Sequence, residues 1–278
     1  MPVDTDALYA ARTLLFVPGD RPDRFAKAAA TGADGVILDL EDAVAPARKD
    51  AARAEVRAWF AGGGTGIVRV NAPETPWHEA DLRLAAERRI PVVLPKAEDP
   101  DVVARVVAAS AGAPVLALIE TAAGVLAARA VCGVDGVVRA AFGNVDLAAE
   151  LGVDHADHTA LSHARQSVVL ASAAAGTAPP IDGVTTAIAD DEALREDVRH
   201  AVRLGFTGKL CIHPRQVAVA HGALAPSVEQ QEWARRVLAA APDGAAAAVD
   251  GQMVDAPVLA RARRILARDS APSSHPGS

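Results

Sequence analysis

The sequence predicts an α/β protein built on a (β/α)8 TIM barrel that is followed by a C-terminal helical lid or oligomer arm. Three observations indicate this fold. Eight short apolar runs recur along the chain, a longer stretch with apolar residues at three- and four-residue spacing follows each run, and Gly or Pro stands at many of the joints. Eight strand–helix units over about 200 residues favour a closed barrel, and a doubly wound sheet is the structural alternative.

The predicted strands follow one another at the spacing that strand–helix units require. They are TLLFV (13–17), GVILDL (35–40), GIVRVN (66–71), PVVLPK (91–96), PVLALIE (114–120), GVVRAAFG (136–143), PPIDGV (179–184) and KLCIHP (209–214). No GxGxxG fingerprint follows the first run, and the GGGTG of 62–66 precedes a strand, which indicates a loop and not a phosphate cradle.

The C-terminal part differs from these repeating units. A helical pattern, APSVEQQEWARRVLAAA (225–241), is followed by the Ala/Gly-rich PDGAAAAVDG and a second helical pattern, QMVDAPVLARARRIL (252–266). We therefore expect a catalytic barrel over 1–224, a lid or arm over 225–268 and a mobile polar tail over 269–278.

Composition excludes several classes of protein. The net charge is −7, the longest basic cluster is the ARARR of 260–264 and only 3% of the residues are aromatic, so no nucleic-acid partner is expected. No apolar run approaches the roughly 18 residues that a membrane span needs, and the N-terminus lacks the pattern of a signal peptide. Cys132 and Cys211 lie far apart in apolar contexts, as reduced core thiols do. We expect a soluble cytoplasmic protein.

Polar residues stand at the ends of all eight predicted strands. In a (β/α)8 barrel these ends converge on one face, where the active site lies. The residues in question are Asp20 and Arg21; Asp39, Glu41 and Asp42; Arg69 and Asn71; Lys96; Glu120; Gly143, Asn144 and Asp146; Asp182; and His213. Packing alone does not explain so many convergent polar groups.

Two of the acids form a plausible metal pair. Neighbouring strands would deliver Glu120 and Asp146, and Mg²⁺ takes one or two carboxylates while leaving room for substrate oxygens. Zinc is disfavoured because no His or Cys cluster accompanies them. The alternatives are a helix-dipole acid for Glu120 and a plain helix N-cap for Asp146.

Arg69 would be nearly buried at a strand end, where an unpaired guanidinium is costly and an anion is needed. That anion is either a substrate carboxylate or oxyanion, or the carboxylate of Asp39 or Glu41, and both arrangements can hold together. Lys96 has the same two interpretations. We expect Asp39, Glu41 and Asp42 to support the arginine and the metal waters without binding the metal directly.

The histidines give no clear indication of a catalytic or metal site. His213 is either a base or, as is more common for a lone His at a strand end, a hydrogen-bonded structural residue. The spacing of His155, His158 and His163 indicates a solvated loop and a helix start more than a metal site.

The sequence resembles the HpcH/HpaI aldolase and citrate lyase β-subunit family, on its CitE-like and malyl-CoA lyase side. The resemblance covers roughly Arg12 to Leu266 and is specific as a set. Its motifs are RTLLFVPGDRPDRFAKA (12–28), ILDLEDAVAPARKDAAR (37–53), VRVN (68–71), LPKAE (94–98), LIETAAGV (118–125), AFGNVDLAAELG (141–152), KLCIHPRQV (209–217) and GQMVDAPVLARAR (251–263).

The resemblance implies a Mg²⁺-dependent enzyme, with Mn²⁺ as a substitute, that makes or breaks a carbon–carbon bond in a thioester of CoA or of a carrier-bound phosphopantetheine. It implies metal ligation by Glu120 and Asp146, catalysis by Arg69, and catalysis by Asp255 on a lid that enters a neighbouring subunit's site, hence a homotrimer or hexamer. Substrate contacts are expected from Arg69, Glu120, Gly143 and Asn144. Without the resemblance, Asp255 is a helix cap before Pro257. CoA phosphates would be met by Arg12, Arg21, Lys27 or Lys49.

Other functions remain open at this point. The same site would hydrolyse a malyl-type thioester with water, or act as the β-subunit of a citrate lyase complex on an acyl-carrier protein. A pyruvate aldolase without a thioester is disfavoured by the DLEDAV and MVDAP motifs, and a non-catalytic scaffold subunit is disfavoured by Glu120, Asp146, Arg69 and Asp255.

Overall fold

The structure is a computed structural model that describes residues 5–240, 247–249 and 252–269. Eight parallel strands form a closed barrel in chain order, which confirms the predicted (β/α)8 fold against the doubly wound alternative. Pairing of β1 with β8, from Thr13↔Lys209 to Leu15↔Cys211, closes the barrel. The strands are β1 (Thr13–Pro18), β2 (Gly35–Asp39), β3 (Ile67–Arg69), β4 (Val92–Leu94), β5 (Val115–Ile119), β6 (Val137–Phe142), β7 (Ala178–Asp182) and β8 (Gly208–Cys211).

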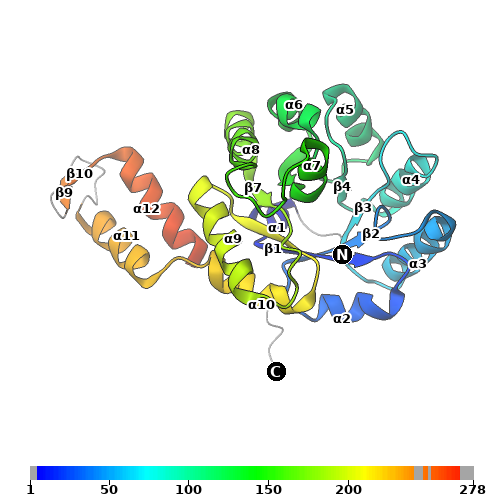
Figure 1. The fold of residues 1–278 in the computed structure, drawn as a ribbon, viewed down its shortest axis with the longest axis horizontal. Coiled ribbons are helices and arrows are strands. Elements are labelled where there is room, and N and C mark those ends of the chain that lie inside the picture. Colours follow the sequence, from blue (N-terminus) through cyan, green and yellow to red (C-terminus); the bar gives the residue numbers. More distant parts are fainter. Residues whose placement is uncertain (1–4, 241–246, 250–251, 270–278) are drawn as a thin grey trace. The chain divides into compact units, whose positions relative to one another are not determined.

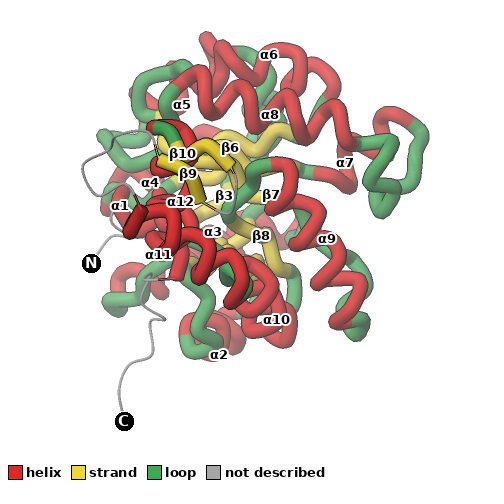
Figure 2. The backbone as a smooth tube through the Cα atoms, turned by 90° about the vertical axis from the view of Figure 1, so that its left-hand side faces the viewer, coloured by secondary structure: helices red, strands yellow, loops and turns green. Residues whose placement is uncertain are grey.

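Helices surround the strands, and α6 and α8 lie side by side on the outside of the barrel (Figures 1 and 2). Their buried faces carry the apolar residues whose three- and four-residue spacing predicted them, such as Ala52, Val56 and Phe60 on α3. The helices of the barrel part are α1 (Thr5–Ala10), η1 (Pro22–Arg24), α2 (Phe25–Ala29), η2 (Pro46–Arg48), α3 (Lys49–Ala61), α4 (His78–Arg88), α5 (Pro100–Ala109), α6 (Ala122–Cys132), α7 (Asn144–Leu151), α8 (Ser162–Ala175), α9 (Asp191–Leu204) and α10 (Pro214–Leu224).

Aliphatic side chains fill one continuous core. Leu14, Ile37, Ile67 and Leu210 are among the buried residues contributed by different strands. Residues two apart on a strand share a face, so the inward positions of one strand meet those of its neighbours. Because side chains fill the interior, a ligand would have to bind at an end of the barrel.

An arginine that the sequence analysis did not single out lies near the start of β6. Arg139 is fully buried and donates hydrogen bonds to the carbonyl oxygens of Leu8, Ala11 and Pro179 and to the Thr207 hydroxyl, at 2.6–3.0 Å. These contacts fasten α1 and the chain that enters β1 to the barrel. Buried backbone oxygens replace the water that the guanidinium loses.

The described residues divide into two compact units with the boundary between His221 and Gly222, three residues before the predicted boundary. The second unit contains α11 (Val228–Ala240), an antiparallel hairpin of β9 (Ala247–Val249) and β10 (Gln252–Val254), and α12 (Ala256–Asp269). Ala234, Val237, Leu259 and Ala262 belong to its own core. The hairpin was not predicted. Of the predicted mobile tail, Asp269 ends α12 and 270–278 lie outside the described residues.

Within the part of the chain that the structure describes, no helix combines the length and apolar composition needed to cross a membrane.

Candidate active site

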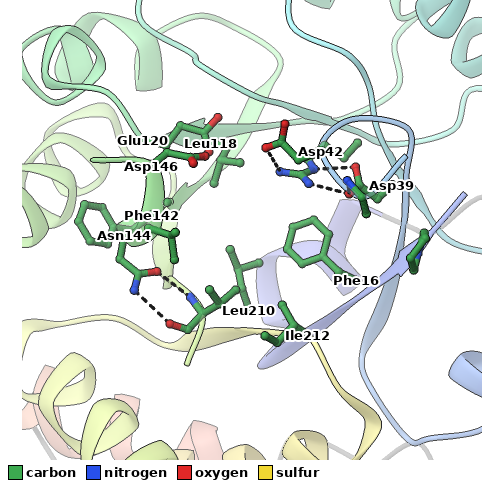
Figure 3. Close-up of a pocket in the computed structure, with 16 residues that line it drawn as sticks. Phe16, Asp39, Asp42, Leu118, Glu120, Phe142, Asn144, Asp146, Leu210 and Ile212 are labelled. Carbon is green, nitrogen blue, oxygen red and sulfur yellow. Dashed lines mark hydrogen bonds and ion pairs between the residues drawn. The ribbon is translucent and has the colours of Figure 1, made fainter. Parts of the chain in front are cut away.

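A cavity of about 400 Å³ opens at the carboxyl ends of the barrel strands (Figure 3). The residues that line it lie on, or directly after, seven of the eight strands, as the convergence of parallel strand ends requires. They are Phe16, Pro18, Asp39, Asp42, Ala43, Arg69, Leu118, Glu120, Phe142, Gly143, Asn144, Val145, Asp146, Val184, Leu210 and Ile212.

Arg69, at the end of β3, is held by carboxylates from the neighbouring strand end. Its Nε and Nη2 donate to the two oxygens of Asp39 at 2.7 and 2.6 Å, and its Nη1 lies 2.9 Å from Oε2 of Glu41. The guanidinium also lies over the Phe16 ring, 4.8 Å from its centroid. Burial alone would lower the pKa of Arg69, but the charge and hydrogen bonds of Asp39 raise it. The expected pairing of Arg69 with Asp39 and Glu41 is therefore present.

The carboxylate of Glu41 has fewer hydrogen-bond donors around it than the carboxylate of Asp39. Its Oε2 is buried and lies outside hydrogen-bonding geometry, although Arg69 is within ion-pair distance. Burial raises the pKa of Glu41 to about 7, against the attraction of Arg69 and with help from the charges of Asp42 and Asp39. Asp42 is 69% exposed and only 4.0 Å from Arg69 Nη1. The three acids of the loop after β2 thus have three different environments.

Lys49, a predicted phosphate contact, is turned into the protein. Its side chain is buried, and its ammonium donates to the carbonyl oxygens of Leu40 and Glu41, both at 2.7 Å. It also lies 5.4 Å from the centroid of the Trp77 ring. Because both carbonyl groups belong to the loop after β2, Lys49 fixes the acidic loop in place.

Glu120 and Asp146 lie next to one another at one edge of the cavity (Figure 3). Glu120 follows β5 and is buried, with Oε1 accepting from the backbone N–H of Lys96 at 2.9 Å. Asp146 lies in the first turn of α7 and is exposed. Burial raises the pKa of Glu120 well above its usual range, and the charges of Glu41 and Asp146 raise it further. Two carboxylates that repel each other in this way are stabilised by a shared cation.

Gly143 leaves the room that this carboxylate pair needs. A Cβ at Gly143 would lie 2.4 Å from Cβ and 2.7 Å from Oε2 of Glu120, closer than real Cβ atoms approach. The position therefore requires glycine for Glu120 to keep its place. The donor set is two carboxylates with no His or Cys beside them, and no cluster of three or more potential ligands occurs among the described residues. This arrangement suits Mg²⁺, which keeps several water ligands.

Lys96 contributes its backbone rather than its ammonium. It adopts a left-handed conformation, with φ 48°, which directs its N–H toward Glu120 while the side chain is exposed. Of the two interpretations of its side chain, the structural ion pair is not seen among the described residues, although the charge of Lys96 lowers the pKa of Glu41.

Asn144 lines the cavity, but its amide is engaged by the chain itself. Its Oδ1 accepts from the N–H of Val184 at 2.9 Å, and its Nδ2 donates to the carbonyl oxygens of Val184 at 3.1 Å and His155 at 3.4 Å. A Cβ at Gly183 would lie 2.0 Å from Oδ1 of Asn144. Little hydrogen-bonding capacity is left for the substrate contact that was expected of Asn144.

A second groove, of about 560 Å³, adjoins the cavity and shares Phe16, Pro18 and Ile212 with it. Arg21 and Lys27, both predicted phosphate contacts, line this groove, as does Arg24, which was not predicted. Arg21 pairs with Asp23 at 3.0 Å. The groove is thus a basic extension of the cavity.

Arg12 lies at the other end of the barrel, because it precedes β1 instead of following it. Its N–H donates to Oδ2 of Asp34 at 2.8 Å, and its Nε lies 3.9 Å from the same oxygen. This carboxylate also receives a hydrogen bond from Thr13 N–H and contacts the His221 ring at 3.0 Å. The structure thus separates Arg12 from Arg21 and Lys27, which were predicted with it as candidates for contacting CoA phosphates.

Asp255 belongs to the second compact unit, where it directly precedes α12. Its Oδ1 accepts from Val258 N–H at 3.2 Å and its carbonyl accepts from Leu259 N–H at 2.9 Å, as an N-cap does. The side chain is half-buried. The helix-cap interpretation is confirmed, and the catalytic one stays a prediction.

The histidines have structural partners. His213 Nδ1 accepts from Arg215 N–H at 3.2 Å, in agreement with the structural interpretation. His155 contacts the Thr186 hydroxyl at 2.8 Å. His158 contacts Oδ1 of Asp197 at 2.7 Å.

Sequence reasoning missed the apolar residues of the cavity, namely Phe16, Leu118, Phe142, Val184, Leu210 and Ile212. In the sequence, these residues are distinguished only by lying near the end of a predicted strand, and many residues of the core lie there as well.

Comparisons with known proteins agree with this geometry. The family model described as HpcH/HpaI aldolase/citrate lyase matches residues 12–214. A citrate lyase subunit beta-like protein of Mycobacterium tuberculosis is 44% identical over 262 residues, covering 91% of this chain and 94% of that protein. A (3S)-malyl-CoA thioesterase of Cereibacter sphaeroides is 34% identical over 270 residues, covering 94% and 95%.

A solved structure extends the comparison to three dimensions. The crystal structure of protein CitE from M. tuberculosis, in complex with magnesium, acetoacetate and coenzyme A, superposes with a TM-score of 0.84 at 41% identity and covers 95% of this chain and 100% of that one. The chain belongs to the HpcH/HpaI aldolase/citrate lyase family.

Proposed function

We propose that the chain is a Mg²⁺-dependent carbon–carbon lyase that cleaves or forms a 3-hydroxyacyl-CoA thioester of the malyl, citramalyl or citryl type, with an acyl-CoA and a 2-oxo acid as the other partners. One observation carries the proposal: a single cavity holds the fixed guanidinium of Arg69 together with the carboxylate pair of Glu120 and Asp146. The magnesium, acetoacetate and coenzyme A of the related CitE structure support it.

In this proposal Glu120 and Asp146 would hold Mg²⁺, and Mn²⁺ substitutes because it prefers the same oxygen ligands. When bound, the ion polarises the hydroxyl or carbonyl oxygen of the substrate. Gly143 keeps Glu120 in position, and the Lys96 N–H orients its other oxygen.

Arg69 supplies the electrostatic stabilisation of the thioester enolate that carbon–carbon cleavage releases. A guanidinium has five N–H donors, and the structure gives hydrogen bonds from two of them, both to Asp39, while Glu41 lies within ion-pair distance of Nη1. The N–H groups of Nη1 would meet substrate oxygens. Since the two carboxylates already hold the side chain in one orientation, little reorganisation is required when negative charge develops.

Asp255 is the proposed proton donor to the enolate carbon, or the base in the condensation direction. It would act in the cavity of a neighbouring subunit of a homotrimer or hexamer. Its Oδ1 accepts a cap hydrogen bond of 3.2 Å, and its half-buried carboxylate has further lone pairs that can accept.

The basic groove is the proposed site for the carrier of the thioester. Arg21, Arg24 and Lys27 would meet phosphate groups there, and the shared wall at Phe16 and Ile212 would lead the thioester into the cavity. CoA and the phosphopantetheine of an acyl-carrier protein share the phosphate that is attached to the pantetheine arm, so either carrier is compatible with the groove.

The test is a reaction of the purified chain with Mg²⁺ and a panel of malyl-CoA, citramalyl-CoA and citryl-CoA, in which 2-oxo acid, acyl-CoA and free CoA are measured separately. We expect stoichiometric 2-oxo acid and acyl-CoA, lost in Glu120→Gln. A chain that binds Mg²⁺ but turns over none of these esters, alone or on an acyl-carrier protein, would contradict the proposal and favour a scaffold subunit.

Hydrolysis is the second candidate, because the relative from C. sphaeroides is named a (3S)-malyl-CoA thioesterase. It predicts free CoA and a hydroxy acid without any 2-oxo acid. The same three measurements therefore separate the two reactions.

Action of Asp255 across a subunit boundary has its own test. Asp255→Ala and Arg69→Lys should each be inactive as pure proteins. Co-refolded mixtures should regain activity, because some cavities then combine an intact Arg69 with an intact Asp255 from a neighbour. No recovery in mixtures that form oligomers would contradict action across the boundary.

A further inference from the structure

The cavity has a charged side and an apolar side. In Figure 3, Glu120 and Asp146 lie along one edge, while Leu210 and Ile212 lie on the opposite side. Phe16 and Val184 also line the cavity, and both are half-buried side chains packed against the core of the barrel. A small molecule bound by the charged side would therefore turn its remaining atoms toward a preformed apolar surface.

Val184 is held more firmly than its position in a loop suggests. Asn144 accepts from its N–H and donates to its carbonyl oxygen, at 2.9 and 3.1 Å. The N–H and the C=O of Val184 are thus both hydrogen-bonded to Asn144, the first residue of α7.

The other side of the loop is fixed as well. Gln216 of α10 donates to the carbonyl oxygen of Thr185 at 2.8 Å, while its Oε1 accepts from the N–H groups of Ile212 and His213 at 2.9 and 3.3 Å. Asn144 and Gln216 are 3% and 2% exposed, so solvent does not compete for these hydrogen bonds. The loop after β7 is consequently a rigid wall whose side chain toward the cavity is Val184.

The following step rests on the proposed function. The carbon that carries the hydroxyl in the proposed substrates has four substituents. The hydroxyl and the carboxylate belong on the charged side, and the carbon that leads to the thioester belongs toward the basic groove, past Phe16 and Ile212. The thioester arm then takes the part of the apolar side at Phe16 and Ile212, and the part lined by Val184 and Leu210 is left for the fourth substituent.

We infer that Val184 forms the pocket for this fourth substituent and sets its size, so that the chain selects substrates with a small alkyl group at that carbon. The corresponding 2-oxo acid has the same group beside its carbonyl carbon. Burial of one methyl group there favours pyruvate over glyoxylate by about tenfold in affinity. A rigid wall limits the gain from larger groups, because a packed loop does not withdraw without cost.

The test is calorimetric binding of glyoxylate, pyruvate and 2-oxobutyrate to the Mg²⁺-loaded protein, which needs no turnover. Val184→Ala should raise the affinity ratio of 2-oxobutyrate to pyruvate by about tenfold, and Val184→Ile should lower it. Opposite shifts in two variants of one residue do not arise from partial unfolding. Ile188→Ala is the matched control, since Ile188 lies in the same loop, is 42% exposed and does not line the cavity.

Unchanged ratios in both Val184 variants, with measurable binding, would overturn the inference and leave the proposed lyase standing. A change of the same size in Ile188→Ala would also overturn it. If the wild-type chain binds Mg²⁺ but none of the three acids, both the inference and the proposed function fail.

Discussion

Asp39→Asn should destabilise the barrel strongly, because each oxygen of Asp39 has two donors. Oδ1 accepts from Arg69 Nε at 2.7 Å and Glu41 N–H at 2.8 Å, and Oδ2 accepts from Arg69 Nη2 at 2.6 Å and Ala43 N–H at 3.2 Å. Whichever way the new amide turns, its NH₂ group faces both a guanidinium N–H and a backbone N–H. The substitution also removes the carboxylate charge beside a guanidinium whose side chain is 11% exposed.

Removal of one partner of a buried ion pair costs about 3–5 kcal/mol. Glu41 remains 2.9 Å from Nη1 of Arg69 and still supplies part of the compensating charge. We therefore expect a loss near the lower end, about 3 kcal/mol. With a slope of about 3 kcal/mol/M, the midpoint of urea unfolding falls by about 1 M.

The assay is urea unfolding followed by far-UV circular dichroism in metal-free buffer. Asp42→Asn is the matched control, since Asp42 lies in the same loop but is 69% exposed and 4.0 Å from the same arginine. Its cost should stay below about 1 kcal/mol. In the double variant Asp39→Asn/Arg69→Met, the loss should be smaller than the sum of the single losses, because the uncompensated charge is gone.

Equal midpoints for Asp39→Asn and Asp42→Asn would refute the reasoning, since it rests entirely on burial and on the two donors at each oxygen. An additive double variant would refute it as well.

Three further predictions concern pH, metal binding and stability. The pKa of Glu41 is raised in the fold from 4.5 to about 7, so its stabilising effect is complete below about pH 4.5 and is lost as the pH rises through 7. In metal-free buffer, the free energy of unfolding of the wild-type protein should therefore fall by about 3 kcal/mol between about pH 5 and pH 8. Glu41→Gln should not show this fall, and a variant with the same pH profile as the wild type would contradict the prediction. Gly143→Ala should weaken Mg²⁺ binding in calorimetry by at least about tenfold, because its Cβ would displace Glu120; unchanged affinity would remove Glu120 from the metal site. Arg139→Met should cost about 3–5 kcal/mol in urea unfolding, because buried carbonyl oxygens lose their donor, and a loss below about 1 kcal/mol would show that water replaces it.

The barrel, and the end of it at which the polar residues gather, could be predicted from the amino-acid sequence. Apolar runs alternating with helical patterns are a direct consequence of burying parallel strands on both faces. Because the carboxyl ends of such strands meet, the residues that follow the runs, such as Asp39, Arg69 and Glu120, are predicted to share one cavity by their sequence positions alone. Arg12 could have been set apart by the same rule, since it precedes its strand.

The contacts of each polar group beyond the strand end could not be predicted in this way and became visible in the folded chain. The direction of a side chain there depends on the loop that follows, and the loop depends on distant partners. Lys49 is folded back onto the carbonyl oxygens of Leu40 and Glu41. Asn144 is bonded to a loop 40 residues further along the chain.

The apolar side of the cavity also required the structure. Phe16 and Val184 have the same residue types as the core, and nothing in the local sequence distinguishes an aliphatic side chain that faces a cavity from one that faces another side chain. The pKa of Glu41 is a further case, because burial and the positions of Arg69, Asp39 and Asp42 set it together. Sequence periodicity specifies which face of an element is buried, whereas the space left between buried faces follows from how all eight strands pack.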